Sequence, residues 1–355
     1  MAVGNSKIEW TESTWSPTTG CDRVSPGCDH CYALTMAKRL KAMGSPRYQR
    51  DGDPRTSGPG FGLTVHPDAL DQPLKWTRPR RIFVNSMSDL FHDQVPDEFI
   101  AQVWAVMALA PQHTFQCLTK RHARMRNLLS NPDFRADVTQ TINGWAVLGE
   151  HDVEHLATAP GDWWPLRNVW LGVSAENQQW ADIRIPKLLD TPAAVRFVSA
   201  EPLLGPITLS PEALGRYYGG DPREDERGID WCIVGGESGP DARPMHPRWA
   251  ASLRDQCTAA GVSFFLKQWG EWSPRAPLNS KGQFDFRGMH TLADDGTLYA
   301  PGDLVWPNGP RVGEALRADH GHAHLTAMYR VGKKSAGREL DGRTWIEYPD
   351  RKAVR

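Results

Sequence analysis

The sequence lacks the features of a membrane or secreted protein. No apolar run in its 355 residues is long enough to span a bilayer, and the first ten residues, MAVGNSKIEW, lack the apolar core of a signal peptide. We therefore expect a cytoplasmic protein without a membrane partner.

An excess of charge is also missing. The 41 Lys and Arg residues nearly balance the 42 Asp and Glu residues, which leaves a formal net charge of -1. This balance excludes a global field that would draw the protein to nucleic acid or anionic lipid, although it is compatible with local basic patches.

Cysteine is scarce, and half of it is isolated. Of six cysteines, Cys117, Cys232 and Cys257 lie singly in apolar segments. This distribution argues against a disulfide framework and fits a reducing compartment.

The other three cysteines, Cys21, Cys28 and Cys31, form a C-x6-C-x2-C set. Glycine and proline between them predict irregular backbone that can wrap around one ion or cluster. From Tyr32 onward apolar residues recur at helical spacing, so the last thiol is expected at a helix start. The partial positive charge of a helix start favours the thiolate, which is the form that binds metal.

Three thiolates are one ligand short of a closed tetrahedral site. A structural zinc ion would need a fourth ligand, which His30 or Asp29 can supply. An iron–sulfur cluster held by three cysteines would instead leave one iron open to a substrate or cofactor. The residues alone leave both possibilities open.

Apolar segments alternate with amphipathic helical segments along most of the chain. This alternation predicts an α/β fold with a parallel sheet covered by helices. A full or partial (β/α) barrel fits better than a doubly wound open sheet, which is the second choice. The expected strands, to which a seventh before Cys21 can be added, are 82–85, 114–120, 168–174, 195–200, 231–236 and 262–268.

The domain organisation follows from these strands. Residues 1–273 are expected to form the barrel with the cysteine loop, interrupted by insertions at 140–166 and 204–229. Residues 274–355 are expected to form an irregular C-terminal extension packed on the barrel.

Polar or small residues follow nearly every expected strand, at the end where such barrels carry their active sites. For any one residue, a helix cap or a solvated turn explains the position about equally well. Their recurrence favours a site. The candidate cofactor-binding residues are Ser86, Asp89, Lys120, Ser174, Glu176, Asn177, Glu201, Gly235, Gly236, Glu237 and Lys267.

The run WSPTTGC followed by SPGCDHCYA resembles the three-Cys-motif family of phage and bacterial genomes, the phage gene product thirty-seven / sixty-eight family, a domain of unknown function. The family is similar to radical S-adenosylmethionine (SAM) enzymes, whose three cysteines bind a [4Fe-4S] cluster while SAM chelates the fourth iron. The likeness continues through VNSMSDLFHDQVPDEF, ALAPQHTFQCLTKR, NVWLGVSAEN, VRFVSAEPLLGP, IVGGESGPDARPMHP, FFLKQWGEW and VGKKSAGRELDGR.

The resemblance implies a radical-SAM-like enzyme with a [4Fe-4S] cluster on the three cysteines and SAM as second cofactor. The segment GGES at 235–238 is similar to Gly-rich, Glu-bearing segments that contact SAM. Glu176 and Asn177 suit the ribose hydroxyls or the amino group of SAM, and Lys120 suits its carboxylate or a substrate phosphate.

The substrate and partners are less defined. The phage setting of the family favours a nucleotide or a nucleic-acid base as substrate. Two alternatives stay open: a nucleic-acid-binding protein whose zinc or iron–sulfur site is structural, and a non-catalytic accessory protein that works with a companion encoded nearby.

Overall fold

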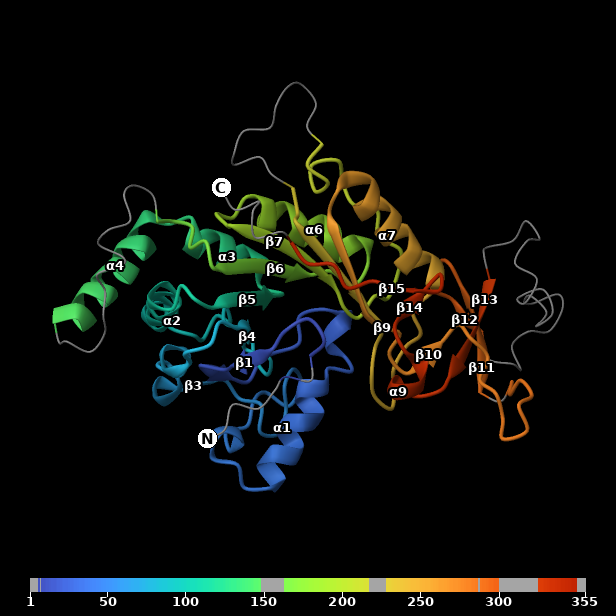
Figure 1. Ribbon diagram of the computed structural model, residues 1–355. Coiled ribbons are helices and arrows are strands. Elements are labelled where there is room, and N and C mark those ends of the chain that lie inside the picture. The colour runs from blue at the N-terminus through green and yellow to red at the C-terminus, as the bar shows by residue number, and fades with distance from the viewer. Residues whose placement is uncertain are drawn as a thin grey trace.

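The computed structural model describes residues 6, 8–147, 163–216, 228–286, 288–299 and 325–349. Its centre is a seven-stranded parallel sheet (Figure 1). Each expected strand is present within a residue or two of its predicted bounds, including the one before Cys21. The strands are β1 (Ser13–Trp15), β4 (Arg81–Val84), β5 (Thr114–Thr119), β6 (Val169–Ser174), β7 (Val195–Ala200), β8 (Trp231–Gly235) and β9 (Ser263–Gln268).

The strands lie side by side in chain order, from β1 at one end of the sheet to β9 at the other. Every connection therefore moves one strand in the same direction, whereas a doubly wound sheet reverses its order at a switch point. Within the described residues β1 and β9 do not pair with each other. The fold is a partial (β/α) barrel, as predicted.

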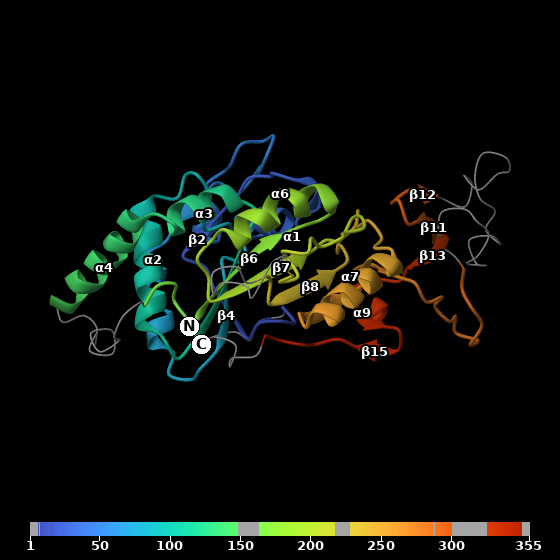
Figure 2. The same cartoon turned by 90° about the horizontal axis from the view of Figure 1, so that it is seen from above.

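Helices connect the strands and cover one face of the sheet. Figures 1 and 2 show α6 and α7 on this face, where α6 contacts β6 and β7, and α7 contacts β8 and β9. In Figure 1, α1 lies on the other side of the sheet. The helices are α1 (Tyr32–Ala42), α2 (Asp97–Leu109), α3 (His122–Leu129), α4 (Pro132–Val147), α6 (Gln178–Leu189), α7 (Pro247–Ala260) and the short α9 (Lys333–Ala336).

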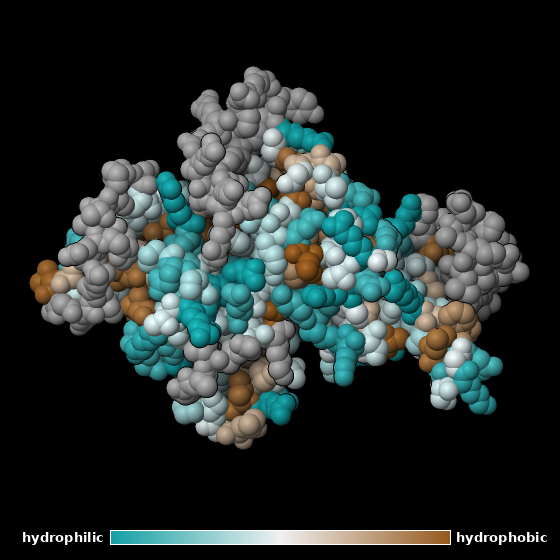
Figure 3. All heavy atoms as spheres, viewed as in Figure 1, coloured by the Kyte–Doolittle hydropathy of each residue, from teal (hydrophilic) through white to brown (hydrophobic). Residues whose placement is uncertain are grey.

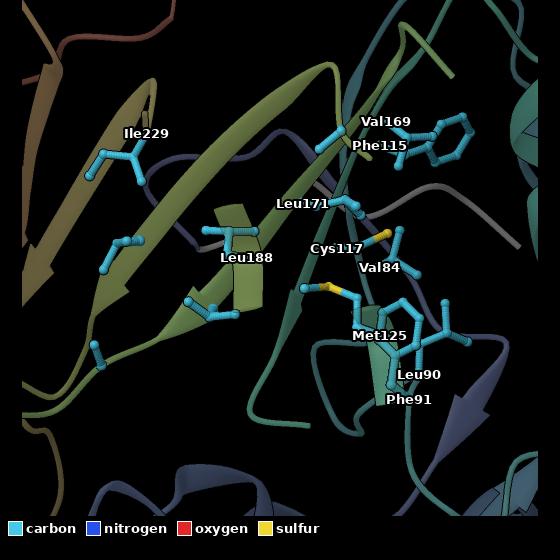
Figure 4. Close-up of a cluster of buried hydrophobic side chains, with 14 of the residues drawn as sticks. Val84, Leu90, Phe91, Phe115, Cys117, Met125, Val169, Leu171, Leu188 and Ile229 are labelled. Carbon is cyan, nitrogen blue, oxygen red and sulfur yellow. The ribbon is translucent and has the colours of Figure 1, made fainter. Parts of the chain in front are cut away.

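Two apolar clusters occupy the two faces of the sheet. On the outer face Phe115, Cys117 and Leu171 pack under the helices (Figure 4). On the inner face Trp231 and Phe197 lie in an aromatic cluster, with their ring centroids 5.7 Å apart. Since both faces are buried, the strands are nearly continuous apolar runs, as in other parallel sheets.

On the inner face of the sheet, the side chains change from apolar to polar along the strands. On β7, Val195 and Phe197 belong to the aromatic cluster, and two residues further on Ser199 lines an open cavity. On β9, Phe265 lies in the cluster and Lys267 lines the cavity. Side chains two apart share a face, so the barrel is filled at the amino ends of its strands and polar at their carboxyl ends.

The described part of residues 274–355 contains more regular structure than predicted. Three of its strands join β10, which lies just before this range, in a four-stranded antiparallel sheet of order β10-β13-β11-β12. Its strands are short, and β10 pairs with β13, more than fifty residues away, so local pattern gives little sign of it. The strands are β10 (Trp272–Ser273), β11 (Met289–Ala293), β12 (Leu298–Tyr299) and β13 (Leu325–Arg330).

Residues 345–347 pack against the barrel. The Leu266 amide donates to the Trp345 carbonyl at 3.0 Å, and the Glu347 amide donates to the Phe264 carbonyl at 3.1 Å. These bonds place residues 345–347 antiparallel along the free edge of β9. The minor two-stranded sheets consist of β2 (Thr18–Thr19) with β3 (Thr64–Val65), and of β14 (Glu339–Leu340) with β15 (Arg343–Thr344).

The structure describes only part of the two predicted insertions. Residues 140–147 continue α4, whereas most of 148–166 and much of 204–229 lie outside the described residues.

No helix in the described part of the chain is long and apolar enough to cross a bilayer. In Figure 3 hydrophobic residues are scattered among hydrophilic ones on the face in view.

Packing between the neighbouring strands β6 and β7 leads to a testable prediction at Gly172. A Cβ atom there would lie 2.4 Å from the Phe197 ring. We expect Gly172→Ala to lower the free energy of unfolding by about 1–3 kcal/mol, measured by urea denaturation, because the buried ring has little room to move. Gly144 lies in α4 with nothing near its missing Cβ, so Gly144→Ala should stabilise by up to about 1 kcal/mol. Equal effects at both positions would contradict this packing.

Candidate functional site

A cavity of about 2000 Å³ opens at the carboxyl ends of the strands, and all three clustered cysteines line it. Most of the predicted site residues meet there, although Glu176, Asn177 and Gly235 are not in its lining. The predicted residues that line the cavity are Ser86, Asp89, Lys120, Ser174, Glu201, Gly236, Glu237 and Lys267.

The cysteine loop follows β1 and ends at α1, as predicted. Cys31 occupies the N-cap position of α1. Its amide donates to the Cys28 carbonyl at 3.3 Å, and the Cys28 amide donates to the Ser25 carbonyl at 2.8 Å. These two turns fold the loop between Ser25 and the start of α1.

The thiol pKa values of Cys21 and Cys31 are raised, whereas the helix start led us to expect a lowered pKa for the last thiol. Burial raises the pKa of Cys31, and the opposing backbone N–H groups of α1 do not offset it. Burial also raises the pKa of Cys21, with a further contribution from Asp89. Loss of solvation therefore outweighs the helix N-terminus, and these thiols need a bound cation to ionise.

The buried carboxylate of Glu176 holds the cysteine loop in place. The Ser25 hydroxyl donates to Glu176 Oε1 at 2.7 Å. Lys120 Nζ lies 3.2 Å from the same oxygen, and Arg184 Nη1 donates to Oε2 at 3.0 Å. The Glu176 and Arg184 side chains are both fully buried.

These partners decide the ionisation of Glu176. Burial alone would raise its pKa, but Lys120 and Arg184, with the Ser25 hydroxyl, lower it below the ordinary value. Glu176 is thus an ionised group inside the protein. Its role in the described contacts is to hold the loop.

Gly27 allows the loop to approach this carboxylate. A Cβ atom at Gly27 would lie 2.4 Å from the Glu176 side chain. Any larger residue would push the segment between Cys21 and Cys28 away from the strand ends.

A second anchor comes from the loop after β8. Arg243 donates from Nε and Nη2 to the two oxygens of Glu237 at 2.9 and 2.6 Å. The same Nη2 donates to the Pro26 carbonyl at 2.8 Å, and Nη1 lies 3.5 Å from Asp29. Arg243 therefore joins the GGES segment to the cysteine loop.

Both candidate fourth ligands are held by this anchor. His30 Nδ1 lies 3.1 Å from Glu237 Oε2, and Asp29 pairs with Arg243. Burial would raise the pKa of Glu237, but Arg243 and His30 lower it. Among the described residues, no three His, Cys, Asp or Glu side chains are grouped so as to hold a single metal ion.

Next to Cys21, Asp22 fixes the start of the loop. Its carboxylate accepts from Thr56 at 2.6 Å and from Ser57 at 2.9 Å. The buried ring of His92 lies 2.8 Å from the other oxygen. Burial would raise the pKa of Asp22, and these three hydrogen bonds lower it.

The end of β5 is fixed by Asp89. Its carboxylate accepts from the Thr119 hydroxyl at 2.7 Å and from the Lys120 amide at 3.0 Å. Asp89 thus positions Lys120, whose ammonium reaches the cavity and Glu176.

Across the cavity, Glu201 and Lys267 form an ion pair of 3.1 Å, and the Ser199 hydroxyl donates to Glu201 at 3.0 Å. Gly235 lies beneath this pair, because a Cβ atom there would be 2.6 Å from Glu201 Oε1. Gly235 therefore makes room for the pair and does not itself line the cavity.

Asn177 has a structural position. Its side chain accepts from the Trp180 amide at 3.2 Å and caps α6. The arginines that hold the loop, Arg184 and Arg243, were not predicted. Arg184 lies inside a helical pattern and Arg243 in a connection, and neither gives a sequence signal that marks it as a partner of a distant carboxylate.

The fold and site define a class: α/β partial barrels with three cysteines beside a cavity at the carboxyl ends of the strands. The chain belongs to the family described as "Protein of unknown function (DUF5131)", whose model matches residues 5–349. This agrees with the predicted membership of a family of unknown function, while the phage name attached to it stays a prediction. A comparison with curated proteins gave no match.

Several solved structures are similar to the chain at low identity. A mutant of spore photoproduct lyase shares 12% identity at a TM-score of 0.40, covering 75% of this chain and 79% of that one. Spore photoproduct lyase complexed with dinucleoside spore photoproduct shares 12% at 0.38, covering 74% and 79%. A mutant with bound AdoMet and dinucleoside spore photoproduct shares 13% at 0.34, covering 66% and 58%.

The charge balance around Glu176 predicts a pH-dependent stability. Because Lys120 and Arg184 hold the pKa of Glu176 below its ordinary value, ionised Glu176 stabilises the fold at pH values above the pKa of the unfolded chain, and this contribution is lost as pH falls through the lower folded pKa. Glu176→Gln should cost about 3–5 kcal/mol at pH 7, since it leaves Arg184 buried without its counter-charge. The deficit should narrow toward pH 4 in urea denaturation.

The matched control is Glu98→Gln on the exposed start of α2, which should change stability by no more than about 0.5 kcal/mol. A Glu176→Gln deficit that is small at pH 7, or constant with pH, would contradict the described ion pairs.

Proposed function

We propose that the protein is a radical-SAM-type enzyme in which Cys21, Cys28 and Cys31 hold a [4Fe-4S] cluster and SAM is the second cofactor. The observation that carries the proposal is an open ligand set. Three thiols line the cavity, while His30 and Asp29, the nearest candidates for a fourth ligand, are engaged by Glu237 and Arg243.

The residues present fit such a cluster. Cys21 and Cys31 are half-buried cysteines whose thiol pKa values are raised by loss of solvation, and a cluster would supply the positive charge that lets them ionise. The loop has no arrangement for a single ion among the described side chains, whereas a cluster is wider than one ion and does not need its ligands to meet at one point.

When bound, the cluster and SAM would supply the reductive cleavage of the SAM sulfonium, which yields methionine and a 5'-deoxyadenosyl radical able to abstract hydrogen. The chain contributes positioning and exclusion of water. Glu176 and Arg243 hold the loop above the strand ends, and the aromatic cluster around Trp231 closes the interior below.

The cavity also suits the cofactor and a substrate together. Its 2000 Å³ exceed the roughly 300–1,000 Å³ of a typical small-molecule pocket. We assign SAM to the side near the cysteines, with Ser86, Asp89 and Lys120. The remaining space, near Glu201 and Lys267, can hold a substrate of nucleotide or nucleobase size.

The experiment that tests this function is anaerobic reconstitution with iron and sulfide. Bound iron, sulfide and zinc are quantified, and the visible spectrum is recorded with and without SAM. The proposal predicts an iron–sulfur band that SAM perturbs, followed by 5'-deoxyadenosine formation with reductant. Stoichiometric zinc without a visible band would indicate a structural site instead. A cluster that never cleaves SAM unless a companion protein is added would indicate an accessory role.

The cysteines themselves give a sharper prediction. Cys28→Ala should lose most of the visible band and SAM cleavage together, because two thiolates cannot retain the cluster. Cys117→Ala is the matched control: Cys117 is buried on the outer face of β5, away from the cavity, and its loss should leave both signals intact. Retention of band and cleavage in Cys28→Ala would refute the proposed ligand set.

A further inference from the structure

We propose that Glu237 and Arg243 hold the His30 imidazole away from the cysteine-bound cluster and so keep one iron position free for SAM. This inference rests on the proposed function and concerns how the same site is kept open. It assigns a positioning role to Glu237 and Arg243.

His30 is the natural competitor for that position. It lies between Cys28 and Cys31 in the chain, so its backbone moves with the ligand loop. Its side chain lines the same cavity and is about one-third exposed, at 32%. Neutral imidazole is the commonest protein ligand for metals, and a bound His30 would close the cluster.

The restraint on His30 is rigid. Glu237 is only 5% exposed and accepts from His30 Nδ1 at 3.1 Å. The carboxylate is itself fixed by Arg243, through two side-chain bonds and through its backbone amide at 2.8 Å. A carboxylate with these four contacts has little freedom to follow the imidazole toward the thiols.

Arg243 adds a second restraint from the loop side. It donates to the Pro26 carbonyl at 2.8 Å and lies 3.5 Å from Asp29. Pro26 and Asp29 flank Cys28, so the same guanidinium that fixes Glu237 also fixes the ligand loop. His30 and the ligand loop are therefore tied to the same Glu237–Arg243 pair.

A carboxylate that contacts a histidine can also orient it as a metal ligand. The two roles predict opposite results when Glu237 is removed: a restrained His30 is released toward the cluster, whereas an oriented His30 loses its ligating position. Restraint is the role proposed here, since Arg243 fixes the Glu237 carboxylate in the loop after β8.

The test uses reconstituted, reduced protein and follows the cluster by electron paramagnetic resonance as SAM is titrated. Wild type should respond to SAM and show no histidine nitrogen coupling in pulsed spectra. Glu237→Ala should show that coupling without SAM, because His30 is released. Its apparent SAM affinity should fall about tenfold if His30 occupies the open position nine-tenths of the time.

The double variant Glu237→Ala with His30→Ala separates restraint from direct SAM binding. Removing the competitor should abolish the coupling and restore the SAM response. A lost contact between Glu237 and SAM would not be restored in this way. Glu271→Ala is the matched control: Glu271 accepts from the Gly239 amide at 3.1 Å, beside the GGES segment, and its loss should leave both signals as in wild type.

The outcomes separate the two proposals. Wild type with zinc or no cluster would refute the proposed function and this inference with it. A SAM-responsive wild type with an unchanged Glu237→Ala variant would overturn the inference alone. His30→Ala covers the case in which Glu237→Ala does not fold: it should keep its iron and its SAM response, and loss of either would identify His30 as a ligand and overturn the inference.

Discussion

The candidate site depends on the ion pairs that balance the negative charges of two buried carboxylates, Glu176 and Glu237. Glu176 and Glu237 lie at the ends of different strands, and their charged partners Lys120, Arg184 and Arg243 come from the end of β5, from α6 and from the loop after β8. A buried charge without its partner is costly. The loop is fixed by hydrogen bonds to this network, from Ser25 to Glu176 and from Arg243 to the Pro26 carbonyl. Cys21 and Cys31 also pack against the apolar cluster that contains Phe61 and Met87.

The barrel itself follows from pattern in the sequence. Apolar runs bounded by turns predicted the strands, because a parallel sheet buried on both faces needs continuous apolar segments. Most of the polar residues that follow these runs line one cavity, since parallel strands bring their carboxyl ends to one edge. Lys267 and Ser199 come from strands separated by β8 and lie in one cavity.

Other features depend on contacts that pattern does not encode. Arg184 and Arg243 resemble ordinary surface arginines in sequence, and only the fold brings them to Glu176 and Glu237. The raised thiol pKa values result from burial by distant residues such as Phe61 and Met87. The second sheet joins short strands across long connections, where local propensity is weak.

The placement of residues 345–347 along β9 bears on the free edges of the sheet. A partial barrel leaves two edge strands, and an exposed edge can pair with the edge of another molecule. Here the edge of β9 is occupied by the chain's own last described segment, and β1 has only three residues. The C-terminal segment thus acts as a built-in edge cover, which a closed barrel would not need.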